Sequence, residues 1–342
     1  MSLYRPVKIG HFELTGNLFL APVAGYTDRA FRSICVQEGA CFSFTELVSA
    51  EALYRNFGRY GLGDDLSRKE PAATAINLIR RGESEKRYAI QLFGAQSESI
   101  YRAASLLAPL RPDVLDINSG CPVQKIVKTG AGSALMKDPA NLGRVVEAAV
   151  RASRESLGDI PVTIKIRSGW DSASLNYAEC ARIAVEAGAA MITLHPRTRA
   201  QNYGGKSEWP HIADLVTRLG VPVTGSGDVY TPEDARQMLC ETGCAAVMFA
   251  RGAMGNPFVF SAAKSLLETG VWEPVPLPAR IAVFLRHLEM LCSDIGERAA
   301  CLEMRKQFCA YTKEVAGGAA LREKAVHAET AGEYRRIVSD YI

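Results

Sequence analysis

Eight short apolar runs recur along the first 250 residues, and each is followed by a segment with helical character. Several runs are continuous rather than alternating, as expected for parallel strands that are covered on both faces. The runs are LFLAP (18–22), FSFTE (42–46), YAIQLF (88–93), DVLDIN (113–118), VTIKI (162–166), MITLH (191–195), VPVTG (221–225) and AVMFA (246–250). Eight strand–helix units in roughly 260 residues predict an α/β fold, a (β/α)8 TIM barrel. A doubly wound sheet is the alternative, because the number of strands does not establish closure.

The segments between the runs carry helix markers. TPEDARQMLCETG (231–243) opens with Thr231 as a candidate N-cap, has Pro232 at the first helical position and ends at Gly243. This order of residues is typical of a helix with defined ends. AECARIAVEAGAA (178–190) also has apolar residues at helical spacing. Helices therefore alternate with strands, as a barrel requires.

The pattern changes after the eighth run. VWEPVPLPAR (271–280) contains three prolines and is typical of a linker, and no strand-like run follows it. We expect a barrel domain at residues 1–270 and a small helical domain at residues 277–342.

Composition excludes several other classes of protein. The formal net charge is only +3, whereas a dedicated nucleic-acid-binding domain is usually more basic. No apolar run approaches the ~20 residues of a membrane-spanning helix. The first residues, MSLYRPVKIG, lack the apolar core of a secretory signal, which predicts a cytoplasmic location. The nine cysteines are scattered and none forms a CxxC pair, so we expect reduced thiols and no metal site.

Polar and glycine residues gather at the ends of the predicted strands. In a TIM barrel these ends meet at one mouth, where active sites are built. In chain order the candidates are Pro22, Val23, Ala24, Gln91, Asn118, Cys121, Lys165, Arg167, His195, Arg197, Ser226, Gly227, Asp228, Ala250, Arg251 and Gly252. Any one of them alone could be a structural polar group, but their shared position indicates a functional site.

The loops after the last two strands are rich in glycine. Such loops often bind phosphate in this fold, because glycine lets backbone N–H groups approach the anion. Gly227 and Gly252 lie in these loops, and Arg251 could add a charge-assisted contact. We therefore expect a phosphorylated ligand.

Lys165 and His195 are each open to two interpretations. A lysine at the end of an apolar strand needs a partner, which is either a neighbouring acid or negative charge that develops during a reaction. His195 either donates to the same region or is a core histidine bonded to backbone.

Cys121 lies in a turn, between Gly120 and Pro122, rather than within an apolar run. A thiol held over the barrel mouth can act as a nucleophile or as a general acid. No histidine lies near it in the sequence to activate a nucleophile. The sequence therefore slightly favours the general acid, which requires only placement and a neutral thiol.

Six segments together resemble the tRNA-dihydrouridine synthase family, and the bacterial B-type branch most closely. They are APVAGYTDRAFR (21–32), INSGCPVQKIVKTGAGSALMKDP (117–139), KIRSGW (165–170), LHPRTRAQNYGGKSEW (194–209), GSGDVYTPEDA (225–235) and ARGAMGNPFVF (250–260). The resemblance implies an FMN-containing barrel, reduced by NADPH, with a C-terminal helical domain that helps to hold tRNA. It also implies a monomer.

The resemblance assigns roles to the candidates. It implies that hydride passes from the flavin to C6 of a uridine and that Cys121 protonates C5. We place Asn118, Arg167 and Arg197 on the substrate side. The implied FMN contacts are Pro22, Val23, Ala24, Gln91, Lys165 and His195, with Ser226, Gly227, Asp228, Ala250, Arg251 and Gly252 around the phosphate.

Two other functions stay open at this point. An FMN barrel could instead reduce a small pyrimidine, although such a substrate does not need a helical tail. The chain could also bind tRNA without activity, although intact Cys121, Lys165 and His195 argue against this.

Overall fold

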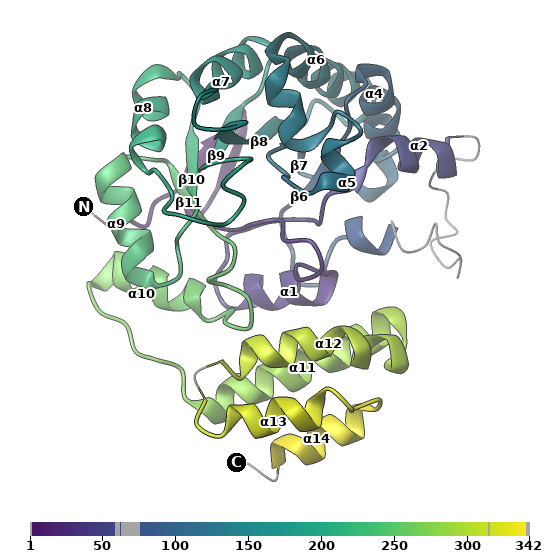
Figure 1. Cartoon of the computed structure of the whole chain (residues 1–342), viewed down its shortest axis with the longest axis vertical. Coiled ribbons are helices and arrows are strands. Elements are labelled where there is room, and N and C mark those ends of the chain that lie inside the picture. Colours follow the sequence, from purple (N-terminus) through teal and green to yellow (C-terminus); the bar gives the residue numbers. More distant parts are fainter. Residues whose placement is uncertain (1, 59–61, 63–75, 314, 340–342) are drawn as a thin grey trace.

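The computed structural model describes residues 2–58, 62, 76–313 and 315–339. Within these residues, eight parallel strands form one closed sheet (Figure 1). They are β3 (Leu18–Leu20), β4 (Phe42–Phe44), β6 (Tyr88–Phe93), β7 (Val114–Ser119), β8 (Val162–Gly169), β9 (Met191–Thr198), β10 (Val223–Ser226) and β11 (Ala246–Phe249). Pairing of β11 with β3 and of β4 with β6 closes the ring. The (β/α)8 prediction is therefore confirmed, and the doubly wound sheet is excluded.

Helices cover the outside of the barrel (Figure 1). They are α1 (Arg29–Gln37), α2 (Ala50–Phe57), α4 (Ser97–Ser105), α6 (Pro139–Ser156), α7 (Tyr177–Glu186), α8 (Pro210–Arg218), α9 (Pro232–Thr242) and α10 (Val259–Thr269). The short α5 (Gln124–Val127) follows the Cys121 loop. Short 3-10 helices lie at Ala108–Leu110 and Gly132–Lys137. The predicted caps of α9 are confirmed: Thr231 and Asp234 bond each other's backbone N–H, and Gly243 ends the helix with φ +66°.

Three short strands were not predicted. β1 (Val7–Ile9) and β2 (Phe12–Leu14) form an antiparallel hairpin, and β5 (Val48–Ser49) pairs with the end of β6. The hairpin residues Val7, Ile9 and Leu14 pack in one cluster with Phe19 and Phe42. The hairpin therefore adds apolar cover to the interior of the sheet.

Two barrel strands are longer than predicted, which changes where their side chains lie. β8 and β9 stay paired as far as Gly169 and Thr198, three residues beyond the predicted ends. Lys165 and His195 therefore lie inside their strands and not at the strand ends. The apolar pattern stops earlier than the strands because the last residues of both face the polar mouth.

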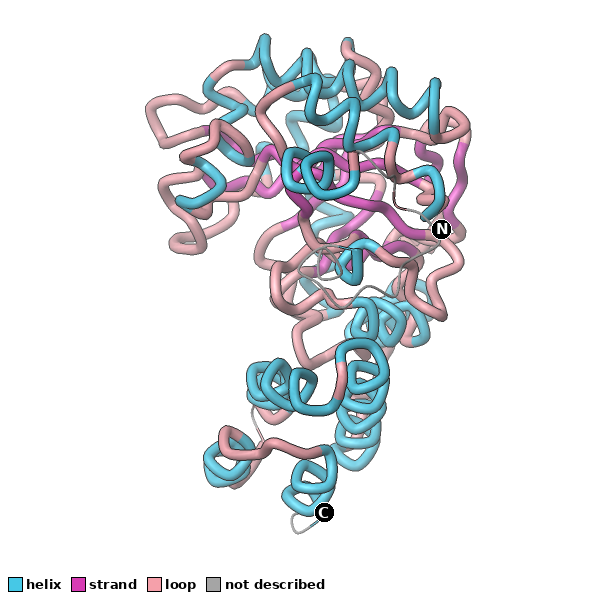
Figure 2. The backbone as a smooth tube through the Cα atoms, turned by 90° about the vertical axis from the view of Figure 1, so that its right-hand side faces the viewer, coloured by secondary structure: helices cyan, strands magenta, loops and turns pink. Residues whose placement is uncertain are grey.

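The C-terminal part is helical, as predicted. It comprises α11 (Leu277–Ile295), α12 (Glu297–Tyr311), α13 (Gly318–Ala325) and α14 (Ala331–Ser339). An aromatic cluster forms its centre, where Phe284 contacts Phe308, Tyr311 and Tyr334 at centroid separations of 5.0–5.6 Å. Figure 2 shows these helices extending away from the barrel.

The helical part packs against α1 of the barrel (Figure 1). The His287 ring stacks on Phe31 at 5.4 Å, and its Nε2 lies 3.3 Å from Oδ2 of Asp28, the N-cap of α1. Arg29 pairs with Asp294 at 2.6 Å. One apolar core runs through both parts, so the boundary at residues 270–277 stays a prediction as a boundary between folding units.

Candidate active site

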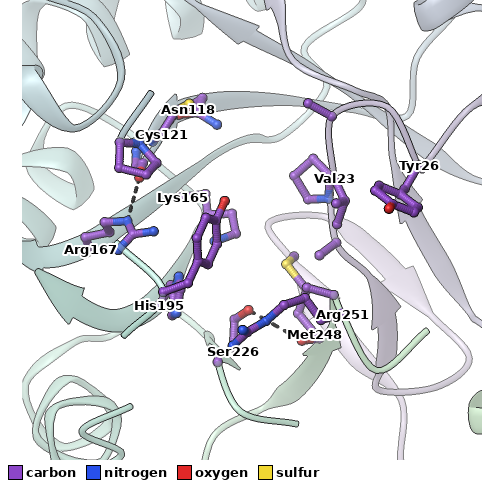
Figure 3. Close-up of a pocket in the computed structure, with 18 of the residues that line it drawn as sticks. Val23, Tyr26, Asn118, Cys121, Lys165, Arg167, His195, Ser226, Met248 and Arg251 are labelled. Carbon is purple, nitrogen blue, oxygen red and sulfur yellow. Dashed lines mark hydrogen bonds between the residues drawn. The ribbon is translucent and has the colours of Figure 1, made fainter. Parts of the chain in front are cut away.

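A cavity of about 550 Å³ opens at the mouth of the barrel, within the range of small-molecule sites. All the predicted site residues line it except Gln91, Arg197 and Gly252. Figure 3 shows Cys121 and Asn118 on one side of the cavity, Lys165 and His195 below them on the same side, and Val23 and Tyr26 across from them. The fold thus brings together residues from the ends of strands far apart in the sequence.

Lys165 projects from β8 into this cavity. Within the described part of the chain it forms no ion pair or hydrogen bond. Burial, and then the charge of Arg167, lower the pKa of Lys165 to about 8, while Asp116 partly opposes this. The lysine is therefore protonated at neutral pH, and its charge is available to a ligand. The alternative of an ion pair with a neighbouring acid is not what the described residues form.

His195 is neutral and oriented. Burial and four neighbouring cations, Lys165 foremost, hold its pKa well below the ordinary value. Nη1 of Arg197 lies 3.2 Å from His195 Nε2. Because a guanidinium can only donate, Nε2 accepts and the ring proton lies on Nδ1. His195 is thus bound to a side chain, not to backbone as the core alternative supposed.

The two arginines expected to bind substrate are used within the chain. Arg167 donates to the carbonyls of Gly120 (2.7 Å) and Asn202 (2.8 Å), and so connects the Cys121 loop with the loop after β9. Arg197 is buried and donates to the Gly205 carbonyl and to both carboxylate oxygens of Asp228. Arg197 does not line the cavity, so the structure gives it an orienting position instead of a substrate contact.

The loop after β10 has the geometry expected for close backbone approach. Gly227 has φ +99°, and a Cβ there would meet Cδ2 of His195 at 2.6 Å. Asp228 accepts from Arg197, from the Ser207 N–H and from Arg251. Its carboxylate would repel a phosphate, so only its backbone N–H suits the predicted phosphate contact.

Gly252 has a packing position. A Cβ at Gly252 would meet the Val229 carbonyl at 2.5 Å and Cα of Tyr230 at 2.7 Å. The missing side chain therefore lets the loop after β11 lie against the loop after β10. Arg251 beside it keeps 38% of its side chain exposed and faces the cavity.

Cys121 is held through its backbone. Asn118 Oδ1 accepts from its N–H at 2.9 Å, and Ser133 donates to its carbonyl through N–H (3.0 Å) and Oγ (2.9 Å). Burial raises the pKa of the thiol, so the group stays protonated at neutral pH. A neutral thiol that no base contacts among the described residues suits a proton donor better than a nucleophile.

Some residues in the site or directly behind it were missed by the sequence analysis. Asp116 lies two residues before Asn118 in β7 and hence on the same face of the strand, which is the pattern that could have revealed it. Tyr203 and Tyr230 are 54% and 40% exposed at the mouth, each within cation–π distance of Arg251. The prediction for these loops rested on glycine and charged residues, and aromatic residues were not considered as a signal.

The described residues contain no group of three or more His, Cys, Asp or Glu side chains arranged to hold a metal ion. None of the described helices is both long and apolar enough to cross a membrane.

The sequence as a whole matches one family model, dihydrouridine synthase (Dus), over residues 19–341. The chain belongs to the dihydrouridine synthase family. The match spans the barrel and the helical part together, so both parts are common to this family.

Individual relatives agree with this assignment. A probable tRNA-dihydrouridine synthase of Treponema pallidum (strain Nichols) is 46% identical, covering 99% of this chain and 97% of the relative. The tRNA-dihydrouridine synthase B of Pseudomonas aeruginosa is 35% identical, covering 92% of this chain and 90% of the relative.

Among solved structures, a complex of 2-naphthoyl-CoA reductase with 2-naphthoyl-CoA is similar, with a TM-score of 0.57 and 13% sequence identity. The similarity covers 78% of this chain and 52% of that one, so the match spans about half the length of the reductase. At this identity the likeness supports the fold alone.

Proposed function

We propose that this protein is an FMN-dependent tRNA-dihydrouridine synthase that reduces the C5=C6 bond of specific uridines, with NADPH as reductant. Membership of the family and the names of the relatives support the reaction and its tRNA substrate. Such an enzyme meets its substrate in the cytoplasm, which is the location that we propose.

The residues of the cavity fit a flavin mononucleotide. Val23, Ala24 and Met248 offer apolar surface to a planar ring system, and the cation of Lys165 suits its electron-rich pyrimidine edge. Gly227 and Arg251, in the loops after β10 and β11, suit the phosphate. When bound, FMN would supply the hydride that the uridine takes up at C6.

The protein's own part in the reaction is to hold and donate a proton. Cys121 would transfer its Sγ proton to C5 of the uridine as C6 gains hydride, and would then recover a proton from water. Neutral His195 adds no positive charge, so Lys165 is the residue of this pair that would offer a charge to the pyrimidine edge. Asn118, which lines the cavity and bonds the Cys121 N–H, would contact the target base beside Cys121.

A uridine within folded tRNA must leave its stack to enter the cavity. The exposed rings of Tyr203 and Tyr230 offer stacking surfaces at the mouth, and Arg251 beside them offers a charge for the backbone. These features favour a nucleic-acid substrate over a small free pyrimidine.

One observation carries the proposal: a neutral thiol, Cys121, lies across a cavity that also presents Lys165, a lysine with no ion-pair partner among the described residues. The test is anaerobic. The protein with FMN is reduced by NADPH, unmodified tRNA transcript is added, and the flavin spectrum is followed. We expect re-oxidation that depends on tRNA, with dihydrouridine in the product.

Cys121→Ala separates the two halves of the reaction. We expect normal reduction of the flavin by NADPH and a loss of about 10²-fold to 10⁴-fold in tRNA-dependent re-oxidation, the usual range for a general acid. Equal loss of both half-reactions would contradict the proton-donor role. Binding of FMN and tRNA without product would contradict the reductase function.

A further inference from the structure

Asp116 is a buried carboxylate that the proposed reaction does not use. It lies in β7, has 0% exposure and does not line the cavity. Its Oδ1 accepts from Oγ1 of Thr163 at 2.5 Å, and its Oδ2 accepts from Nε2 of Gln91 at 2.6 Å. No ion pair links it to a basic side chain within the described residues. A buried charge of this kind is costly, so its contacts require an explanation.

The hydrogen bonds continue from Asp116 to the Cys121 loop. Oε1 of Gln91 accepts from Nδ2 of Asn118 at 2.9 Å. Oδ1 of Asn118 then accepts from the backbone N–H groups of Gly120 at 3.2 Å and Cys121 at 2.9 Å. Three side chains from two neighbouring strands thus form one series that begins inside the barrel and ends at the thiol-bearing residue.

Both ends of the series dictate its direction. An ionised carboxylate only accepts, so Gln91 must turn its NH2 group towards Asp116 and its oxygen towards Asn118. Backbone N–H groups only donate, so Asn118 must turn its oxygen towards Gly120 and Cys121 and its NH2 group towards Gln91. At the contact between the two amides, the NH2 group of Asn118 therefore faces the oxygen of Gln91, which is one donor and one acceptor. The arrangement is therefore satisfied in only one way.

We propose that Asp116 is a positioning residue: through Gln91 and Asn118 it holds the backbone N–H groups of the Cys121 loop in place. Its importance for catalysis rests on the proposed function, in which Cys121 is the proton donor. The carbonyls of the same loop are held separately, by Arg167 on Gly120 and by Ser133 on Cys121. Asp116 therefore controls the side of the loop that those residues do not reach.

The test first adds a second carboxylate to the series, at position 91, and then leaves a single carboxylate there instead of at position 116. In Gln91→Glu, two carboxylates face each other and fit only while they share a proton. When Gln91→Glu is combined with Asp116→Asn, the new amide at position 116 can donate to the new carboxylate at position 91. That carboxylate can still accept from Asn118, so every hydrogen bond of the series is restored with one carboxylate. Thr163→Val is the matched control, because it removes a contact of Asp116 outside the series.

The readout is the rate at which iodoacetamide alkylates Cys121, measured by peptide mass spectrometry on the whole protein from pH 6 to 8.5. The exposed Cys240 is the internal reference. Relative to wild type at the same pH, we expect Gln91→Glu to react about tenfold faster at high pH, as expected for loss of one or two buried hydrogen bonds. We expect this faster alkylation of Gln91→Glu to disappear towards pH 6. The double variant and Thr163→Val should react at the wild-type rate at every pH.

The proposal would be overturned if Gln91→Glu were alkylated at Cys121 at the wild-type rate at every pH. It would also be overturned if the alkylation rate of the double variant were no closer to wild type than that of Gln91→Glu. If Gln91→Glu does not fold, Asp116→Leu keeps the side-chain outline, gives Gln91 no acceptor and should also accelerate alkylation. Alkylation needs no tRNA. A wild-type protein that fails to reduce tRNA would contradict the proposed function, while the alkylation series would still decide the role of Asp116.

Discussion

At the scale of single residues, burial sets the charge state of the site. Lys165 and His195 lie within one cavity, and burial favours the neutral form of both. The lysine keeps its proton at neutral pH because its ordinary pKa is far higher. The histidine does not, because its ordinary pKa is close to neutrality and several cations surround it. The site therefore offers the positive charge of Lys165 and a neutral His195 that carries its ring proton on Nδ1.

A pH dependence of flavin binding follows from Lys165. Its pKa of about 8 without ligand means that its charge is present below pH 8 and lost above it. We expect FMN affinity to fall as pH rises through 8, by at most about tenfold per pH unit, because one proton is involved. Fluorescence titration of FMN between pH 7 and 9.5 measures this. Lys165→Met should bind more weakly and lack the fall; a parallel fall in the variant would assign it to another group.

The protonation of Asp116 makes the stability of the fold depend on pH. Burial raises its pKa to about 6, above the ordinary value of 3.8. The folded state therefore holds this proton more tightly, and the benefit is complete below pH 3.8 and lost as pH rises through 6. We expect the free energy of unfolding of wild type, minus that of Asp116→Asn, to fall by about 2 kcal/mol between pH 4 and 7. Urea unfolding at several pH values measures the difference, and a constant difference would contradict the assignment.

At the scale of elements, the loops after the last strands depend on the absence of side chains. Gly227 combines a positive φ with the contact to His195, so its conformation is imposed by two neighbouring elements. Strand β9 fixes the histidine, and the loop after β10 must pass close beside it. The glycine is needed for this passage whether or not a phosphate is bound.

Gly227→Ala tests this loop. The left-handed backbone costs roughly 1–2 kcal/mol for a residue with Cβ, and the His195 ring must also move. We expect reduced thermal stability together with weaker FMN binding, measured by a melting curve and a fluorescence titration. Gly220→Ala is the control: it has no positive φ, and a Cβ there meets nothing within 4 Å. Equal effects of the two substitutions would contradict the argument.

At the scale of the whole molecule, the helical part also supports the cavity. Nε2 of Gln307, in α12, donates to the carbonyl of Tyr26 at 3.2 Å, and Lys306 lies over the Tyr26 ring at 5.8 Å. From the barrel side, Oε2 of Glu46 accepts from the Gly25 N–H at 2.7 Å. The loop that carries Val23 and Tyr26 is thus held from both parts. Removing residues 277–342 would disturb this wall as well as any RNA-binding surface.

Gln307→Ala isolates that support. Gln307 is buried, and loss of its hydrogen bond leaves the Tyr26 carbonyl unpaired where α12 contacts the barrel. We expect a loss of about 1 kcal/mol in stability and weaker FMN binding, with α12 still folded. Leu302→Ala, at an exposed position of the same helix, is the control for stability. Unchanged FMN affinity in Gln307→Ala would show that the wall does not need the helical part.

Much of the architecture could be predicted because it depends on local patterns. Continuous apolar runs indicated the eight barrel strands, and Thr231, Pro232 and Gly243 indicated the ends of one helix. Most candidate residues were found because parallel strands carry their C-terminal ends to one mouth. The short hairpin, by contrast, has only three residues in each strand, too few for a period to stand out.

The type and order of the elements, the loops around the cavity and the family to which the chain belongs all follow from local patterns in the amino-acid sequence. Those patterns do not show that Lys165 has no ion-pair partner among the described residues, that Arg197 bonds His195 and Asp228, or that Asp116 is linked to Cys121 through Gln91 and Asn118. These facts depend on contacts between residues that are far apart in the chain. Closure of the sheet and the length of β8 and β9 set those contacts, and a local pattern of apolar and polar residues does not contain them.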